Sequence, residues 1–159
     1  MVQSALEFAS EAHQGQVDKG GVPYFNHCIT VATMAIWIAR NQYEGLELDL
    51  DILFQAALLH DVVEDTKVTL GEIENIFGSK VAGIVARLTK TSSEFRETYI
   101  QQLRQDSYAC VIKLCDLDHN SNLNRISRLT KKDYERVARY RSESGQIQQF
   151  LKEILESKS

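Results

Sequence analysis

The sequence predicts a single all-α domain of about eight helices. Its 159 residues include one proline and eight glycines, so helix-breaking residues are few. Apolar residues recur every three or four positions in most segments, as in amphipathic helices, and the alternation typical of strands is hard to find. A chain of this length can bury one substantial core, and no linker or repeat divides it, so we expect one domain over residues 1–159.

The first half of the chain predicts three helices and one long loop. Residues 4–13 carry an apolar stripe at helical spacing. Residues 15–26, GQVDKGGVPYFN, contain three glycines and Pro23 and therefore form a loop. Residues 27–42 are apolar on most sides, which indicates a central helix, and residues 50–61 form a third helix.

The second half predicts a further series of helices. Thr69 and Glu72 have the spacing of a capping box, so a short helix begins there, and Gly78 ends it. Further helices are expected at residues 79–90, 95–104, 107–118 and 132–155. The inward-facing side chains of the last helix are expected to be Val137, Tyr140, Ile147, Leu151 and Ile154.

Composition and charge exclude several classes of protein. The net charge of −4 argues against general nucleic-acid binding. No apolar run approaches the roughly 20 residues that span a bilayer, which argues against a membrane as a partner. The first residues lack the basic start and apolar stretch of a signal peptide, so a cytoplasmic location is expected. The three cysteines, Cys28, Cys110 and Cys115, form no CxxC pair and are interpreted as reduced thiols.

An unusual charge cluster follows an apolar segment at AALLHDVVEDT, residues 56–66. His60, Asp61, Glu64 and Asp65 crowd the end of a helix that should be buried. Adjacent residues of a helix differ by about 100° in direction, so His60 and Asp61 can converge on one point beside it. Buried carboxylates repel one another unless a cation neutralises them, so a metal ion explains the cluster. The alternative is a solvated helix end without a function.

Two further segments supply the remaining metal ligands. His27 follows the glycine-rich loop in PYFNH, and Asp116 ends the apolar run of VIKLCDLDHN. Together with His60 and Asp61 they make a site of two histidines and two carboxylates for one divalent ion. This ligand mixture suits Mn²⁺, Fe²⁺ or Zn²⁺, and the spacing does not choose among them.

These residues resemble the pattern of the HD-domain metal-dependent phosphohydrolases. The strings AHQGQ, GVPYFNH, AALLHDVVEDT, IFGSKVAGIVARLTK and IKLCDLDHN, in this order, resemble the hydrolase domain of the RelA/SpoT alarmone enzymes. The stand-alone small alarmone hydrolases, the Mesh1-like proteins, are most similar in layout. The resemblance extends over residues 5–154 and implies an HD-domain helical fold, with no room for a synthetase domain.

The resemblance implies a reaction and assigns residues to it. The reaction is the Mn²⁺-dependent removal of the 3′-pyrophosphate from guanosine tetra- or pentaphosphate, a small-molecule nucleotide. Glu64 and Asp65 match the catalytic pair; the alternative for them is a cap of the next segment. The residues that match substrate-binding positions are Lys19, Asn120 and Tyr140. For Lys19 the alternative is a solvated loop lysine, and for Tyr140 an interior aromatic.

A basic strip and two departures from the family pattern bear on the substrate. Seven basic residues lie between Arg125 and Arg141, and this excess can steer an anionic ligand or form an ordinary exposed face. The first departure is in the loop, where Val17 and Asp18 replace arginines of the relatives, one of which stacks on guanine. A carboxylate there would repel phosphate, so recognition of the base is open. The second departure is Asp118, where relatives commonly carry Arg or Leu. The alternatives are therefore hydrolysis of another nucleotide, such as a nucleoside monophosphate or nicotinamide nucleotide phosphate, and a non-catalytic nucleotide-sensing module. Nothing in the sequence indicates an oligomeric state.

Overall fold

A computed structural model describes residues 2–159, with the side chains described from Ser4 onward. It contains eight α-helices of seven or more residues and one helix of four. Within the described residues the extended structure is limited to one isolated bridge, between Val17 and Pro23. The predicted all-α fold is therefore confirmed. No described helix combines the length and apolar character that crossing a bilayer requires.

The helices follow one another with short connections. The α-helices are α1 (Val2–Ala12), α2 (Phe25–Asn41), α3 (Leu50–Leu58), α4 (Val62–Asp65), α5 (Leu70–Phe77), α6 (Ser79–Leu88), α7 (Arg96–Gln102), α8 (Ser107–Asn120) and α9 (Lys131–Ser157). Three short 3₁₀ helices are η1 (Glu44–Leu46), η2 (Leu103–Gln105) and η3 (Leu123–Arg125).

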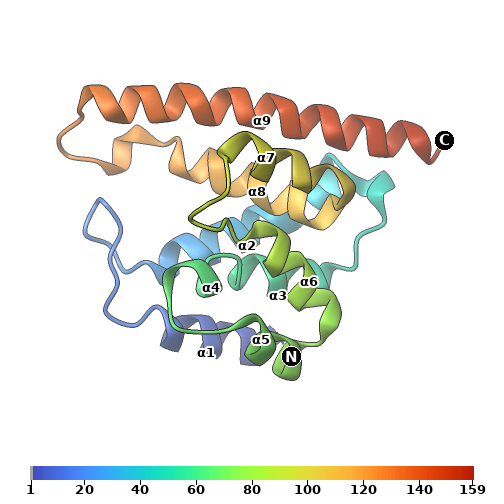
Figure 1. The fold of residues 1–159 in the computed structure, drawn as a ribbon, viewed down its shortest axis with the longest axis horizontal. Coiled ribbons are helices and arrows are strands. Elements are labelled where there is room, and N and C mark those ends of the chain that lie inside the picture. Colours follow the sequence, from blue (N-terminus) through green and yellow to red (C-terminus); the bar gives the residue numbers. More distant parts are fainter. Residues whose placement is uncertain (1) are drawn as a thin grey trace.

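The helices form layers around the central helix α2. The long helix α9 lies along one side of the molecule with α8 beneath it, and α1 and α5 lie on the opposite side (Figure 1). Between them α2 packs against both α3 and α8. The apolar core fills the space between these helices, with Leu53, Ile112 and Ile147 among its fully buried side chains. This arrangement brings the ends of α2, α3 and α8 together.

Two helix boundaries confirm the sequence prediction. The backbone N–H of Thr69 donates to Glu72 Oε2 at 2.8 Å, and Thr69 Oγ1 accepts from the Glu72 N–H, which completes the capping box of α5. Gly78, with φ of 90°, ends the helix in a conformation that favours glycine. In α9, Val137, Ile147 and Leu151 are buried as predicted, whereas Tyr140 and Ile154 are half-buried.

One predicted boundary is wrong, because the third helix ends at Leu58 and not at Asp61. The imidazole of His60 donates from Nδ1 to the carbonyl oxygen of Ala57 at 2.7 Å. In a continuous helix this carbonyl would accept from the N–H of Asp61, so the side chain competes with the backbone and the helix ends. The chain turns and α4 begins after Asp61, whose carbonyl accepts from the Asp65 N–H at 2.9 Å.

Candidate metal and active site

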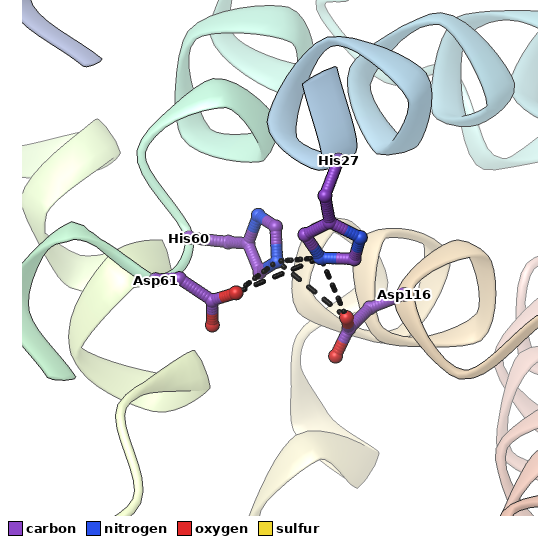
Figure 2. A group of neighbouring side chains, drawn as sticks. All are labelled: His27, His60, Asp61 and Asp116. Carbon is purple, nitrogen blue, oxygen red and sulfur yellow. Dashed lines mark hydrogen bonds and ion pairs between the residues drawn. The ribbon is translucent and has the colours of Figure 1, made fainter. Parts of the chain in front are cut away.

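Four side chains from three separated segments converge on one point. His27 lies in the first turn of α2, His60 and Asp61 connect α3 to α4, and Asp116 lies in the last turns of α8. One ligand atom of each, a ring nitrogen or a carboxylate oxygen, lies within 4.8 Å of the other three (Figure 2). The structure thus brings together all four residues that the sequence predicted as ligands.

The spacing of these atoms fits a single divalent ion. The Nε2 atoms of His27 and His60 are 3.3 Å apart. His27 Nε2 lies 3.1 Å from Asp116 Oδ1, and His60 Nε2 lies 3.0 Å from Asp61 Oδ2. Ligands about 2.1 Å from an ion are separated by about 3 to 4 Å, so these three separations are typical of ligands that share one ion. Two nitrogens and two oxygens are a donor set that first-row divalent metals accept.

The surroundings orient the lone pair of His60 toward the centre. Its Nδ1 donates to the Ala57 carbonyl, so in the neutral ring Nε2 carries the lone pair. A metal-binding histidine commonly donates its other nitrogen to such a backbone oxygen, which fixes the tautomer and the ring orientation. The break between α3 and α4 therefore prepares His60 to coordinate an ion.

His27 is oriented by a second histidine. Its Nδ1 lies 2.7 Å from Nδ1 of His119, so one of the two nitrogens must donate and the other accept. Burial first, and then the positive charges of Arg125 and His27, lower the pKa of His119 to about 4. His119 is consequently neutral near pH 7 and accepts the proton of His27 Nδ1, which leaves His27 Nε2 free for an ion.

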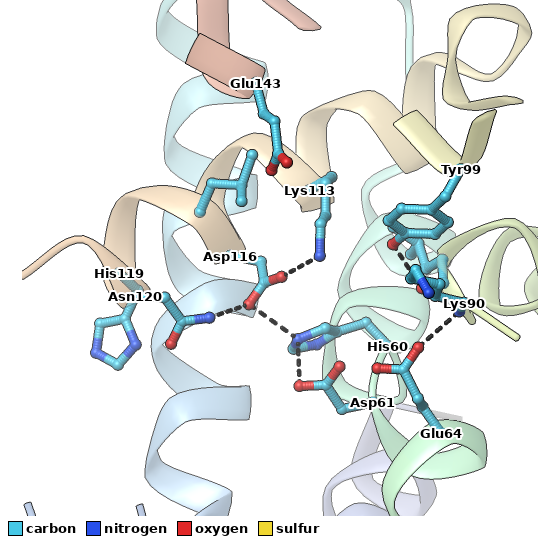
Figure 3. A network of polar contacts seen from close by, with 12 residues as sticks. His60, Asp61, Glu64, Lys90, Tyr99, Lys113, Asp116, His119, Asn120 and Glu143 are labelled. Atoms are coloured by element: carbon cyan, nitrogen blue, oxygen red, sulfur yellow. Dashed lines mark hydrogen bonds and ion pairs between the residues drawn. The ribbon is translucent and has the colours of Figure 1, made fainter. Parts of the chain in front are cut away.

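Both carboxylates are held by hydrogen-bond donors. Asp116 accepts from Asn120 Nδ2 at Oδ1, at 2.8 Å, and from Lys113 Nζ at Oδ2, at 2.7 Å (Figure 3). Asp61 Oδ2 accepts from the hydroxyl of Tyr24 at 2.5 Å. Each donor removes one orientation that the carboxylate could otherwise adopt, so the oxygens facing the histidines are fixed in place.

The pKa values of Asp116, His27 and His60 reflect the proximity of opposite charges. Burial alone would raise the pKa of Asp116, but Lys113 and the two histidines outweigh it and hold the pKa well below its usual range. Burial would lower the pKa of His27, yet the nearby carboxylates of Asp116 and Asp61 raise it above 6.5. The pKa of His60 is raised well above the ordinary value, against burial, chiefly by Asp61. The neighbouring carboxylates therefore favour the protonated form of both imidazoles.

Replacing Lys113 with methionine is expected to weaken Mn²⁺ binding roughly 10- to 100-fold, the usual effect of removing a group that orients a ligand. The change removes the ammonium group that fixes Asp116 Oδ2 and keeps an unbranched side chain in the largely buried position. Titration calorimetry with Mn²⁺ measures the effect, and Lys113→Arg should recover part of the affinity. Affinity equal to that of the unchanged protein in Lys113→Met would show that Lys113 has no part in positioning Asp116.

Glu64 and Asp65 lie on α4, directly after the Asp61 ligand. Glu64 Oε1 accepts from the backbone N–H of Lys90 at 2.6 Å, which connects α4 to the end of α6 (Figure 3). Burial first, and then the charge of Asp61, raise the pKa of Glu64 and of Asp65 above their ordinary values. A raised pKa makes a carboxylate a better proton acceptor, as a general base requires.

The three residues predicted to bind substrate line one pocket of ≈ 270 Å³. Lys19 comes from the loop between α1 and α2, Asn120 from the end of α8, and Tyr140 from α9. Asn120 also donates to Asp116, so the pocket adjoins the predicted metal site. We call this the α8–α9 pocket; its lining residues are Val17, Asp18, Lys19, Gly20, Tyr24, Asn120, Arg125, Ile126, Arg136 and Tyr140.

The basic strip contributes only part of its charge to this pocket. Arg125 and Arg136 line it, whereas Arg128, Lys131 and Arg139 do not. The expectation that Asp18 would repel phosphate needs correction, because Asp18 Oδ2 lies 3.0 Å from Arg125 Nη1 and its charge is neutralised there. Departure from the family pattern at Asp18 is therefore accompanied by a basic partner from another segment.

Sequence reasoning did not find Lys113 or Tyr24. Both have a signal that can be recognised afterwards: a lysine inside the apolar run VIKLC, and a tyrosine three residues before a ligand histidine. Lys113 stands one helical turn before Asp116, so the two share a face of α8. Tyr24 reaches Asp61 across 37 positions of sequence, and helical spacing gives no indication of such a contact.

Comparisons with known proteins identify the family to which the chain belongs. The model of the HD domain family matches residues 5–147. The guanosine-3′,5′-bis(diphosphate) 3′-pyrophosphohydrolase MESH1 of Danio rerio is 34% identical over 156 residues, covering 92% of this chain and 82% of that protein. The bifunctional (p)ppGpp synthase/hydrolase SpoT of Escherichia coli (strain K12) is 32% identical over 149 residues, but the chain spans only 20% of its length.

One solved structure is similar to this chain over almost the entire length of both. It is described as a metazoan ortholog of SpoT that hydrolyses ppGpp and plays a role in starvation responses. It aligns with a TM-score of 0.69 and 26% sequence identity, covering 99% of this chain and 95% of that one. The chain belongs to the HD-domain family.

Proposed function

We propose that the protein is a Mn²⁺-dependent hydrolase that removes the 3′-pyrophosphate of guanosine tetra- and pentaphosphate. In this proposal residues 1–159 act as one hydrolase domain. The observation that carries it is the convergence of four ligand atoms within 4.8 Å, beside a pocket lined by basic side chains. The names of the relatives in zebrafish and Escherichia coli support the substrate.

The residues divide the work of hydrolysis among them. His27, His60, Asp61 and Asp116 would hold the ion, which when bound lowers the pKa of water and polarises a phosphoryl oxygen. Glu64 accepts a proton from the attacking water. Burial and the negative charge of the neighbouring Asp65 raise the pKa of Glu64 and so favour this transfer. Lys19 and Arg136 attract the phosphates, while Asn120 and Tyr140 contact the nucleotide. We favour Mn²⁺, and Fe²⁺ and Zn²⁺ suit the same ligands.

A panel of nucleotides tests the substrate. The protein is incubated with Mn²⁺ and guanosine tetraphosphate, a nucleoside monophosphate or a nicotinamide nucleotide phosphate, and released pyrophosphate and orthophosphate are measured separately. Pyrophosphate from guanosine tetraphosphate is the expected product. Orthophosphate from another nucleotide would replace the proposal with a different phosphohydrolase, and binding without release would indicate a sensing module.

Metal binding is expected to weaken as the pH falls, because the ion requires neutral imidazoles and the pKa of His27 is raised above 6.5 without it. The stability of the metal-free protein should instead increase as the pH falls. Raised histidine pKa values contribute stability below pH 6.5 that is lost as the pH rises through the folded-state values. The gain in Tm on adding Mn²⁺ should therefore increase with pH. Thermal denaturation with Mn²⁺ or with chelator at several pH values measures it, and a gain independent of pH would contradict the histidine ligands.

A further inference from the structure

The carboxylate of Asp18 is fixed in the wall of the α8–α9 pocket. Its Oδ1 accepts from the backbone N–H groups of Gly20 at 2.8 Å and of Val22 at 3.0 Å, so the side chain closes a turn within the loop. Its Oδ2 accepts from Nη1 of Arg125, 107 positions away, at 3.0 Å. Asp18 therefore fixes the guanidinium of Arg125 relative to the loop.

The backbone of Arg125 is held at the same place. A Cβ on Gly20 would lie 2.6 Å from the carbonyl oxygen of Arg125, so only glycine allows this close approach of loop and 3₁₀ helix η3. The loop and η3 thus contact each other through both the main chain and the side chain of Arg125. The guanidinium is consequently in place before any ligand arrives, and it loses little freedom on binding.

Arg125 has a buried hydrogen-bond donor without a partner. Its Nε is buried and has no hydrogen-bond partner among residues 2–159. With Nη1 engaged by Asp18, the remaining side of the guanidinium presents Nε and Nη2 as two parallel donors. A buried donor without a partner is costly, so a ligand with two adjacent acceptors would be stabilised here. Phosphate oxygens and the O6 and N7 atoms of guanine both provide such a pair.

The distribution of charge separates these two ligands. Asp18 and Arg125 together carry no net charge, which favours a neutral group beside them. Asp133 is shared by Lys19 Nζ, at 3.6 Å, and by Arg136 Nη1, at 2.9 Å, so these three residues carry one net positive charge. Phosphates are therefore expected near Lys19 and Arg136, and the base near Arg125.

We propose that Arg125, positioned by Asp18, selects guanine by donating from Nε and Nη2 to O6 and N7 of the base. Adenine carries an amino group in place of O6, and that group cannot accept from the second donor. The proposal rests on the proposed function in taking a nucleotide as the ligand, and it assigns the selection of the base to a pair that joins two distant segments.

Binding of GDP, IDP, ADP and inorganic pyrophosphate to the Mn²⁺-loaded protein tests this assignment by calorimetry. Arg125→Met should weaken GDP and IDP, which share O6 and N7, roughly tenfold, the usual discrimination of one bidentate contact. Binding of ADP and pyrophosphate should change less than twofold. Arg125→Lys keeps the positive charge but lacks the two parallel donors of the guanidinium, so it should also lose the preference for GDP and IDP over ADP. This variant tests the proposal if the methionine variant does not fold. Equal loss of pyrophosphate binding, or unchanged GDP binding, would overturn the proposal.

Matched variants separate the positioning role of Asp18 from a general effect. Asp18→Asn as a single substitution should reduce GDP binding, because Asp18 acts through Arg125. Added to Arg125→Met, the same substitution should cause no further loss, and an additive loss in the double variant would overturn that role. Arg128→Met, an exposed arginine outside the pocket, should bind as before. Guanine selectivity without pyrophosphate release from guanosine tetraphosphate would contradict the proposed function alone, whereas release without an effect of Arg125 would contradict this inference alone.

Discussion

Replacing Asp61 with alanine is expected to abolish Mn²⁺ binding and hydrolysis together. The change removes one of four ligand atoms and the carboxylate closest to His60 Nε2, at 3.0 Å. It also leaves two buried imidazoles facing each other with less negative charge between them, which disfavours a cation. Because the ion supplies several kcal/mol of charge stabilisation, the rate should fall at least roughly a thousandfold. Metal content after dialysis and pyrophosphate release are the two measurements.

An exposed aspartate close by provides the control for this substitution. Asp118 lies two residues after Asp116 on α8 and is exposed, so Asp118→Ala removes a similar charge without touching the four ligand atoms. Its metal content and rate should match those of the unchanged protein, and circular dichroism should show equal helix content in both variants. Full metal stoichiometry in Asp61→Ala would remove Asp61 from the ligand set.

The convergence of His60, Asp61 and Asp116 could be predicted because these residues directly follow apolar segments. His60 and Asp61 follow AALL, and Asp116 ends VIKLC, so burial of the apolar residues carries the polar ones into the core. Helices were predicted well for the same reason, since the period of apolar residues is a local property. The capping box at Thr69 is likewise local, and it was found.

Contacts between distant segments could not be predicted in this way. The end of α3 is a local feature that could not be predicted either, because the side chain of His60 takes the Ala57 carbonyl that the helical pattern of apolar residues assigns to the backbone. The contacts of Tyr24 with Asp61 and of Asp18 with Arg125 join segments that only the complete fold brings together. Asp18 by itself indicated repulsion of phosphate, and its neutralisation became apparent only when its partner was known.

The exchange of Glu64 for glutamine is expected to leave the ion bound and to lower kcat by roughly 10²- to 10⁴-fold, the usual contribution of a general base. Glutamine keeps an oxygen that can accept from the Lys90 N–H, as Oε1 does at 2.6 Å, so α4 should remain in place. It cannot accept a proton from water near neutral pH. Titration with Mn²⁺ and the rate at saturating ion and substrate therefore separate the metal from the base.

Glu74→Gln, at an exposed position on α5, controls for the loss of a carboxylate. It should leave the affinity for Mn²⁺ and kcat unchanged. A normal rate in Glu64→Gln with the ion bound would assign the proton to another acceptor. Asp65 would then be the next candidate, because burial raises its pKa as well and it follows Asp61 by one turn. If Asp65→Asn alone lost the rate, the base would be the Asp65 carboxylate and not the Glu64 carboxylate that the Lys90 N–H holds.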